Sequence, residues 1–185
     1  METKTWIDYA IAIGSISTPL LVLLLTAVGW KARNSIERKI ELENKLRDDR
    51  IKTYNQILEP FIIFLMTDVA WNTNKKNKNI DKTEYATSKL LSLEYREASF
   101  KLALVASDAL VKSYNNLMQS FYNSEQDTRD NTLKFKEMLE LLGELLIEIR
   151  KSMGNEGTKL NHWDMCEFWM SDARKLKNGT LILEK

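Results

Sequence analysis

The longest run of uncharged residues covers positions 9–30, between Asp8 and Lys31. Most of these residues are apolar, and the run reaches the length of roughly 20 residues that a helix needs to cross a bilayer. A single segment satisfies its own backbone in lipid only as a helix. The pattern therefore predicts one N-terminal transmembrane helix, with the bulk of the chain outside the bilayer.

Charged and polar positions dominate residues 31–58, where no glycine or proline interrupts a helical pattern. Pro60 is expected to break or restart this helix. We therefore expect a charged helical extension over residues 31–59. Its sparse apolar residues form a narrow stripe suited to packing on a neighbouring helix or on a sister copy, and they are Ile36, Ile40, Leu42, Leu46, Ile51, Tyr54, Ile57 and Leu58.

Beyond Pro60, short polar segments alternate with stretches whose apolar residues recur at helical spacing. Asp81 and Glu84 have the spacing of a capping box, so one helix is expected to begin there. Further helices are expected after Ser107, near Thr132 and after Asn161. The buried faces are expected to hold Leu91, Tyr95, Ala98, Leu102 and Val105, then Leu110, Tyr114, Leu117 and Phe121, then Phe135, Met138, Leu139, Leu142, Leu145, Leu146, Ile149 and Met153.

Two glycines have a positional meaning in this pattern. Gly143 lies inside the helix expected from Thr132, where glycine costs about 1 kcal/mol relative to alanine, so it predicts a close helix contact. Gly154 and Asn155 form a signal that ends the same helix. The predicted fold class is all-α, with domains at residues 1–30 (N-terminal segment and transmembrane helix), 31–59 (extension), 60–176 (cytoplasmic helical domain) and 177–185 (tail).

Composition and flanking charge refine this prediction. Only two prolines and six glycines in 185 residues suit a helical protein, and the single cysteine excludes an internal disulfide framework. The net charge of +1 gives no strong field that would recruit nucleic acid. Basic residues are denser after the apolar run than before it, which predicts a single-pass inner-membrane protein with its bulk in the cytoplasm. The membrane-flanking residues are Trp6, Trp30, Lys31 and Arg33.

Small and hydroxyl residues within the run suggest a role beyond anchoring. Small residues spaced by four let membrane helices approach closely, which predicts self-association. Hydroxyl groups are able to line a wet path if several copies assemble, and a proline is expected to kink the helix. The candidate pore or helix-packing residues are Gly14, Ser15, Ser17, Thr18, Pro19 and Thr26. A cleaved signal peptide, cut after Ala27, Val28 and Gly29, is the alternative interpretation of the run.

Templates for catalysis and metal binding are mostly missing from the sequence. There is no phosphate-binding glycine loop, CxxC, HExxH or GxSxG motif, and one histidine with one cysteine cannot build an ordinary zinc site. No cofactor or metal is therefore expected. His162 and Cys166 lie four residues apart, so they form either a thiolate–imidazole pair or a buried cysteine beside a surface histidine. Arg150 and Lys151 fall in a last helical turn, where cations complement the helix C-terminus.

The segments LALVASDALVKSYNNLMQSF and LIEIRKSMGN, together with the apolar run and its charged extension, resemble the accessory membrane proteins of type VI-B CRISPR systems. The resemblance implies a divergent HEPN-like helical domain over residues 60–176. HEPN ribonucleases use an arginine followed a few residues later by a histidine. Here Arg150 is followed by Asn155, which cannot exchange protons near neutral pH, although His162 is able to substitute in space. The catalytic candidates are Arg150, Asn155 and His162, and the departure favours a protein without enzymatic activity.

By the same resemblance, the chain is expected to enhance type VI-B CRISPR antiviral defence. Copies would form a homo-oligomeric ring of about eight subunits whose spans surround a pore. The pore would permeabilise or depolarise the inner membrane after RNA targeting. The implied partners are membrane lipid, sister copies and, through a functional link, an RNA-guided RNA-targeting effector, while direct RNA binding stays open. Two alternatives also stay open: a membrane-tethered HEPN-type ribonuclease, and a non-catalytic membrane tether for a partner.

Overall fold

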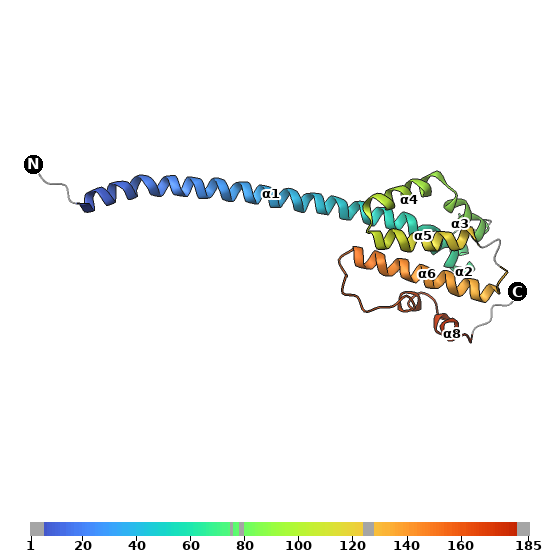
Figure 1. Ribbon diagram of the computed structural model, residues 1–185. Helices are drawn as coiled ribbons and strands as arrows, with labels where there is room; N and C mark the ends of the chain where they lie inside the picture. Colours follow the sequence, from blue (N-terminus) through green and yellow to red (C-terminus); the bar gives the residue numbers. More distant parts are fainter. Residues whose placement is uncertain (1–5, 75, 78–79, 124–127, 181–185) are drawn as a thin grey trace, which may run out of the picture. The chain divides into compact units, whose positions relative to one another are not determined.

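The computed structural model describes residues 6–74, 76–77, 80–123 and 128–180, and within the first helix it leaves out the side chains of residues 8–10, 12–13, 16 and 18. Across these ranges the regular structure is helical and no strand occurs, which confirms the all-α prediction. The helices are α1 Trp6–Leu65, α2 Asp68–Thr73, α3 Lys82–Leu90, α4 Leu93–Val105, α5 Asp108–Tyr122, α6 Asn131–Ser152, α7 Asp164–Glu167 and α8 Ala173–Lys177 (Figure 1).

Helix α1 runs without interruption through Pro19 and Pro60. The helical continuation over residues 31–58 is confirmed, and the break expected at Pro60 is wrong. Proline inside a helix removes one hydrogen bond and costs about 3 kcal/mol. Pro60 is fully buried, and its neighbours Ile57 and Phe61 belong to the hydrophobic core, so burial of this stretch offsets the local cost.

The chain forms two compact units, Met1–Leu46 and Arg47–Lys185. In the first unit, the described side chains of residues 20–25 are all 55–67% exposed, and Val28 and Trp30 are exposed to a similar degree. Since a helix has 3.6 residues per turn, six consecutive exposed residues cover every side of it. This segment is therefore apolar all round and is covered by no other part of its own unit.

Within the described part of the chain, no helix combines the length and apolar character needed to cross a membrane. Tyr9, Ala10 and Thr18, which the sequence placed in the span, have side chains outside the described residues. The finding contradicts the predicted single-pass inner-membrane localisation, and the transmembrane helix of the predicted fold is unsupported.

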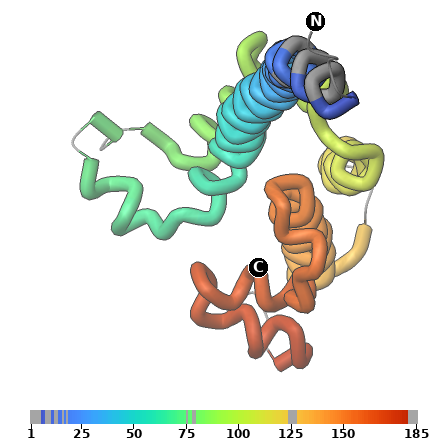
Figure 2. The backbone as a smooth tube through the Cα atoms, turned by 90° about the vertical axis from the view of Figure 1, so that its left-hand side faces the viewer, coloured from blue at the N-terminus to red at the C-terminus, as the bar shows by residue number. Residues whose placement is uncertain are grey.

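In the second unit, four helical segments surround the main core. The end of α1 contributes Tyr54, Ile57 and Phe61, while α5 packs against α6 (Figures 1 and 2). The buried residues from the other three segments are Tyr95, Ala98 and Leu102 of α4, Leu110, Tyr114 and Leu117 of α5, and Leu142 and Leu145 of α6. Residues of all three predicted faces therefore meet in this core, although Leu91, predicted to be buried with them, is 75% exposed.

Side-chain caps set the starts of several helices. The Asp81 carboxylate accepts a hydrogen bond from the Glu84 amide at 2.8 Å, and Ser107 caps α5 in the same way, as the sequence predicted. The single helix expected after Asp81 is split, because Ser92 caps a new helix by accepting from the Tyr95 amide at 3.1 Å. Such caps stabilise a helix by about 1 kcal/mol each.

A second, smaller core joins α6 to the C-terminal segment. Leu139 packs with Trp163, Cys166 and residues of α8. Asn161 and Asp164 are joined by reciprocal hydrogen bonds: the Asn161 Oδ1 accepts from the Asp164 amide at 3.1 Å, and Asp164 Oδ2 accepts from the Asn161 amide at 2.8 Å. These bonds close the turn that leads into α7.

Candidate functional site

The end of α6 is built by the backbone of Arg150, Lys151, Gly154 and Asn155. The Asn155 amide donates to the Arg150 carbonyl at 3.2 Å, and the Gly154 amide donates to the Lys151 carbonyl at 3.0 Å. Gly154 has a φ of +97°, the left-handed conformation that glycine adopts without strain. These two bonds form a Schellman motif, so the predicted helix ending is confirmed.

The side chains of the predicted pair, Arg150 and Asn155, lie at the surface beside this helix end. Arg150 Nε donates to Thr158 Oγ1 at 3.2 Å, and both Arg150 and Asn155 are exposed. The Thr158 amide donates to the Asn155 carbonyl at 3.0 Å, which closes the next turn. Arg150 and Asn155 are thus brought together, and their described bonds shape the loop after α6.

His162 lies in the loop before α7 and contacts a different part of α6. Its backbone rests against Gly143, two turns before Arg150, which corresponds to about 10 Å along the helix axis. The imidazole ring lies 5.7 Å from the ring of Trp163. No described bond links His162 to Arg150 or Asn155, so the structure brings Arg150 and Asn155 together but not His162.

Cys166 lies inside the smaller core. Its Sγ donates to the carbonyl of Leu139 at 3.5 Å, and its side chain is fully buried. Burial raises the pKa of the thiol to about 11. A protonated, buried thiol is a poor nucleophile, so the geometry favours a structural cysteine over a thiolate–imidazole pair with His162.

The helix-packing candidates of α1 have mixed environments. Thr26 Oγ1 donates to the Val22 carbonyl at 2.7 Å, so its hydroxyl proton is used in a bond within its own helix. Ser17 Oγ lies 3.5 Å from the Gly14 carbonyl, and a Cβ atom on Gly14 would meet nothing within 4 Å. The other candidates whose side chains are described are exposed; they are Ser15 and Pro19, and the flanking residues Trp6, Trp30, Lys31 and Arg33.

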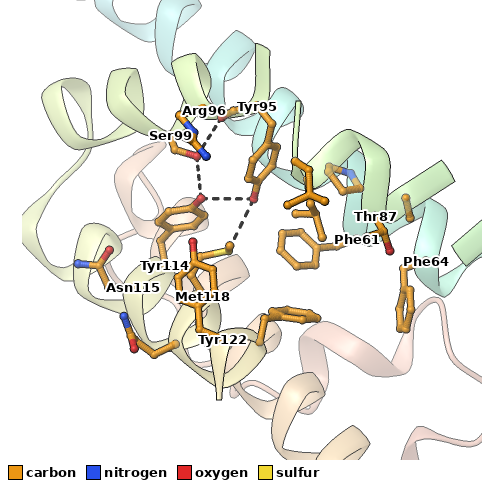
Figure 3. Close-up of a pocket in the computed structure, with 16 residues that line it drawn as sticks. Phe61, Phe64, Thr87, Tyr95, Arg96, Ser99, Tyr114, Asn115, Met118 and Tyr122 are labelled. Atoms are coloured by element: carbon orange, nitrogen blue, oxygen red, sulfur yellow. Dashed lines mark hydrogen bonds between the residues drawn. The ribbon is translucent and has the colours of Figure 1, made fainter. Parts of the chain in front are cut away.

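A cavity of about 670 Å³ opens in the second unit between the end of α1, α3, α4 and α5 (Figure 3). Six aromatic residues line it, together with hydroxyl and amide groups and the Arg96 guanidinium. Its polar lining residues are Thr87, Tyr95, Arg96, Ser99, Tyr114, Asn115, Gln119 and Tyr122. The sequence predicted Tyr95 and Tyr114 only as core residues. Because a buried tyrosine usually needs a hydrogen-bond partner, two buried tyrosines were the available sign of a polar cluster here.

A chain of hydroxyl groups lies on one side of this cavity (Figure 3). Ser99 Oγ donates to the Tyr95 carbonyl at 2.9 Å and lies 2.7 Å from the Tyr114 hydroxyl. The Tyr114 hydroxyl lies 3.4 Å from that of Tyr95, which in turn lies 3.9 Å from Met118 Sδ. Burial, assisted by the neighbouring Tyr114, raises the pKa of Tyr95 well above its usual value, so its hydroxyl stays neutral.

Comparison with known protein families, with curated protein sequences and with solved structures finds no match to this chain. The HEPN-like character of the bundle is therefore still a prediction. Among the described residues, no three histidine, cysteine, aspartate or glutamate side chains converge closely enough to hold a metal ion.

Proposed function

We propose that this protein is a non-enzymatic effector that works by assembling with copies of itself through residues 19–30 of α1. The observation that carries the proposal is the exposure of apolar side chains on every side of that segment. Exposed apolar surface costs about 25 cal/mol per Å², and a helix that is hydrophobic all round is normally covered. One neighbouring helix covers only one side, so a bundle of several copies suits this segment better than a dimer.

The charged part of α1 in the first unit also favours a second copy of the chain as the binding partner. Arg33 pairs with Glu37 at 2.8 Å and Lys45 with Glu41 at 2.9 Å, so both signs of charge alternate along the helix. Such a surface is complementary to a second copy of itself. Ile36 is 58% exposed, and the stripe of exposed apolar residues continues through Ile40, Leu42 and Leu46.

The antiviral part of the proposal rests on the resemblance to type VI-B CRISPR accessory proteins. We propose that the bundle of the second unit is the divergent HEPN-like domain and that the assembly enhances defence alongside an RNA-guided RNA-targeting effector. An effector of this kind needs no acid–base pair, which agrees with Arg150 and Asn155 serving a helix end. Membrane permeabilisation is left out of the proposal because no described helix has the required length and apolar character.

A phage challenge tests the proposal. Cells carrying the RNA-guided effector would receive the wild-type chain, the double variant Leu21→Gln/Leu24→Gln, or the matched variant Phe100→Gln/Leu104→Gln. Both pairs exchange two exposed apolar side chains for glutamine, but Phe100 and Leu104 lie on α4. We expect the α1 variant to lose the added protection and the α4 variant to keep it. Full protection by the α1 variant at equal protein level would contradict the proposal.

A further inference from the structure

The cavity between α1, α3, α4 and α5 is independent of the segment proposed for assembly. It lies within the second unit, and its volume of about 670 Å³ falls in the range of 300–1,000 Å³ typical of small-molecule sites. An apolar pocket of this size with a few convergent polar groups is the default candidate for a ligand site. The chemistry of the wall indicates which kind of ligand would suit it.

Aromatic rings form much of the wall. Phe61 and Phe121 lie with their ring centroids 5.8 Å apart, and Phe64 and Tyr122 also line the cavity. Tyr122 is 68% exposed, so its side chain is accessible from solvent. Rings arranged in this way attract a flat aromatic group, because offset or edge-to-face contacts between rings add about 0.5–1.5 kcal/mol beyond burial.

The described residues that line the cavity carry positive charge only. Among the described lining residues, Arg96 carries the only formal charge, and its guanidinium has no ion pair or side-chain hydrogen bond in the described ranges. Glu59, next to the lining residue Pro60, is paired with Lys89 at 3.2 Å. A planar guanidinium without a partner favours a carboxylate or a phosphate, which it is able to bind through two parallel hydrogen bonds.

The hydroxyl chain supplies a further donor. Ser99 Oγ donates its proton to the Tyr95 carbonyl. In the 2.7 Å contact between the Ser99 and Tyr114 hydroxyls, the donor is therefore Tyr114. The Tyr95 hydroxyl lies 3.4 Å from the Tyr114 hydroxyl, longer than the 2.5–3.0 Å of an ordinary O–H···O bond, and it donates to the Met118 sulfur at 3.9 Å. Tyr95 is only 6% exposed, and Figure 3 shows its hydroxyl pointing toward the other lining side chains. Because a thioether sulfur is only a weak acceptor, this hydroxyl is suited to donate to a ligand oxygen instead.

We propose that this cavity binds a small ligand in which a flat aromatic ring is joined to an anionic group. The ring lies against the aromatic wall, the anion pairs with Arg96, and Tyr95 donates to a polar atom of the ligand. Nucleotides and aromatic carboxylates share this chemistry.

Calorimetric titration of the full chain with two matched probe series tests the proposal. The first series is adenosine 5′-monophosphate, adenosine and ribose 5-phosphate, and the second is indole-3-acetate, indole and acetate. We expect the ring-plus-anion member of one series to bind at least about tenfold more tightly than either of its halves. The series that responds identifies the source of the ligand. If neither joined probe binds better than its halves, the proposal is wrong.

Three variants assign the effect to the cavity. Arg96→Gln is expected to weaken the joined probe about tenfold and leave the neutral ring probe unchanged, because it removes only the charge-assisted pair. Tyr95→Phe should weaken binding severalfold, since it keeps the ring and removes the donor. Thr87→Trp should abolish binding, because Thr87 is exposed on the wall and a bulky side chain fills the space without altering the core.

Arg47→Gln is the matched control, since Arg47 is an exposed arginine of the same unit that does not line the cavity. It should bind the joined probe as the wild type does. Equal losses in Arg96→Gln and Arg47→Gln, or binding that survives Thr87→Trp in a folded protein, would place the probe elsewhere and overturn the proposal. Circular dichroism of each variant shows whether it is folded.

Discussion

Gly143 of α6 lies directly against the backbone of His162, which belongs to the loop before α7. A Cβ atom on Gly143 would approach the His162 carbonyl carbon to 2.9 Å and its Cβ to 2.9 Å, closer than real contacts allow. This approach lets the C-terminal segment pack on α6 and explains why a glycine interrupts a helix of otherwise good helix formers. The close contact predicted at Gly143 is confirmed, although its partner is loop backbone rather than another helix.

Gly143→Ala is therefore expected to destabilise the second unit. Alanine gains up to about 1 kcal/mol of helix propensity, but the overlap with backbone forces a displacement that costs more. We expect the free energy of unfolding to fall by about 1–3 kcal/mol, measured by urea denaturation.

Two glycines provide controls for this prediction. Gly29 is also helical, and Gly157 lies in the same unit; a Cβ atom on either would meet nothing within 4 Å. Gly29→Ala and Gly157→Ala should change stability by less than about 1 kcal/mol. An unchanged or raised stability for Gly143→Ala would mean that the loop does not rest on α6 as described.

Gly154→Ala tests the ending of α6. With a φ of +97°, alanine at this position should cost about 1–2 kcal/mol, while Gly157→Ala in the same loop, where no positive φ occurs, should cost much less. Thermal and urea unfolding of the two variants measure the difference. Equal effects of the two substitutions would show that the left-handed ending contributes little.

Asn155→His restores the histidine of the HEPN pattern without restoring a site. The described hydrogen bonds of Asn155 use its backbone, and its side chain is exposed, so stability should change by less than about 0.5 kcal/mol. Labelled RNA should stay intact with the wild type, with Asn155→His and with Arg150→Ala. RNA cleavage by Asn155→His that disappears in the Arg150→Ala/Asn155→His double variant would contradict the structural role assigned to this loop.

Cys166 links stability to alkaline pH. Burial raises its pKa from 9.0 to about 11, so the unfolded chain loses the thiol proton first as the pH rises. The stabilisation by the protonated thiol is complete below pH 9 and is lost as the pH rises toward about 11, a change of about 2–3 kcal/mol.

Denaturant unfolding of the wild type and of Cys166→Ala, followed from pH 8 to pH 11, measures this effect. The difference in unfolding free energy between the two proteins should shrink over the upper part of that range, whereas the ionisation of Tyr95 is common to both and cancels. A difference that stays constant with pH would show that the thiol pKa is not raised.

Features controlled by neighbouring residues could be predicted from the sequence. The caps at Asp81 and Ser107, the ending at Gly154 and the all-helical class follow from short-range hydrogen bonds and spacing. The prediction failed at Pro60, where tertiary burial outweighs the local cost of proline, and at Ser92, whose cap divides one apolar pattern into two helices.

The cavity could not be predicted, because it arises only when distant segments meet. Tyr95 and Tyr114 come from different helices, and the periodicity that placed both in the core gives no sign of their hydroxyl contacts. The position of His162 relative to the other HEPN-like candidates could not be predicted for the same reason. Spacing places Arg150 near Asn155, but the position of His162 depends on how the loop before α7 rests on Gly143.

The mass of the purified full chain in detergent-free buffer tests the central claim of self-assembly most directly. Light scattering coupled to size exclusion should give several multiples of the 21.6 kDa protomer for the wild type and for Phe100→Gln/Leu104→Gln. Leu21→Gln/Leu24→Gln should shift the mass toward one protomer while keeping its helical circular dichroism. A wild-type mass of 21.6 kDa, or uptake of single copies by added phospholipid vesicles, would contradict assembly through residues 19–30.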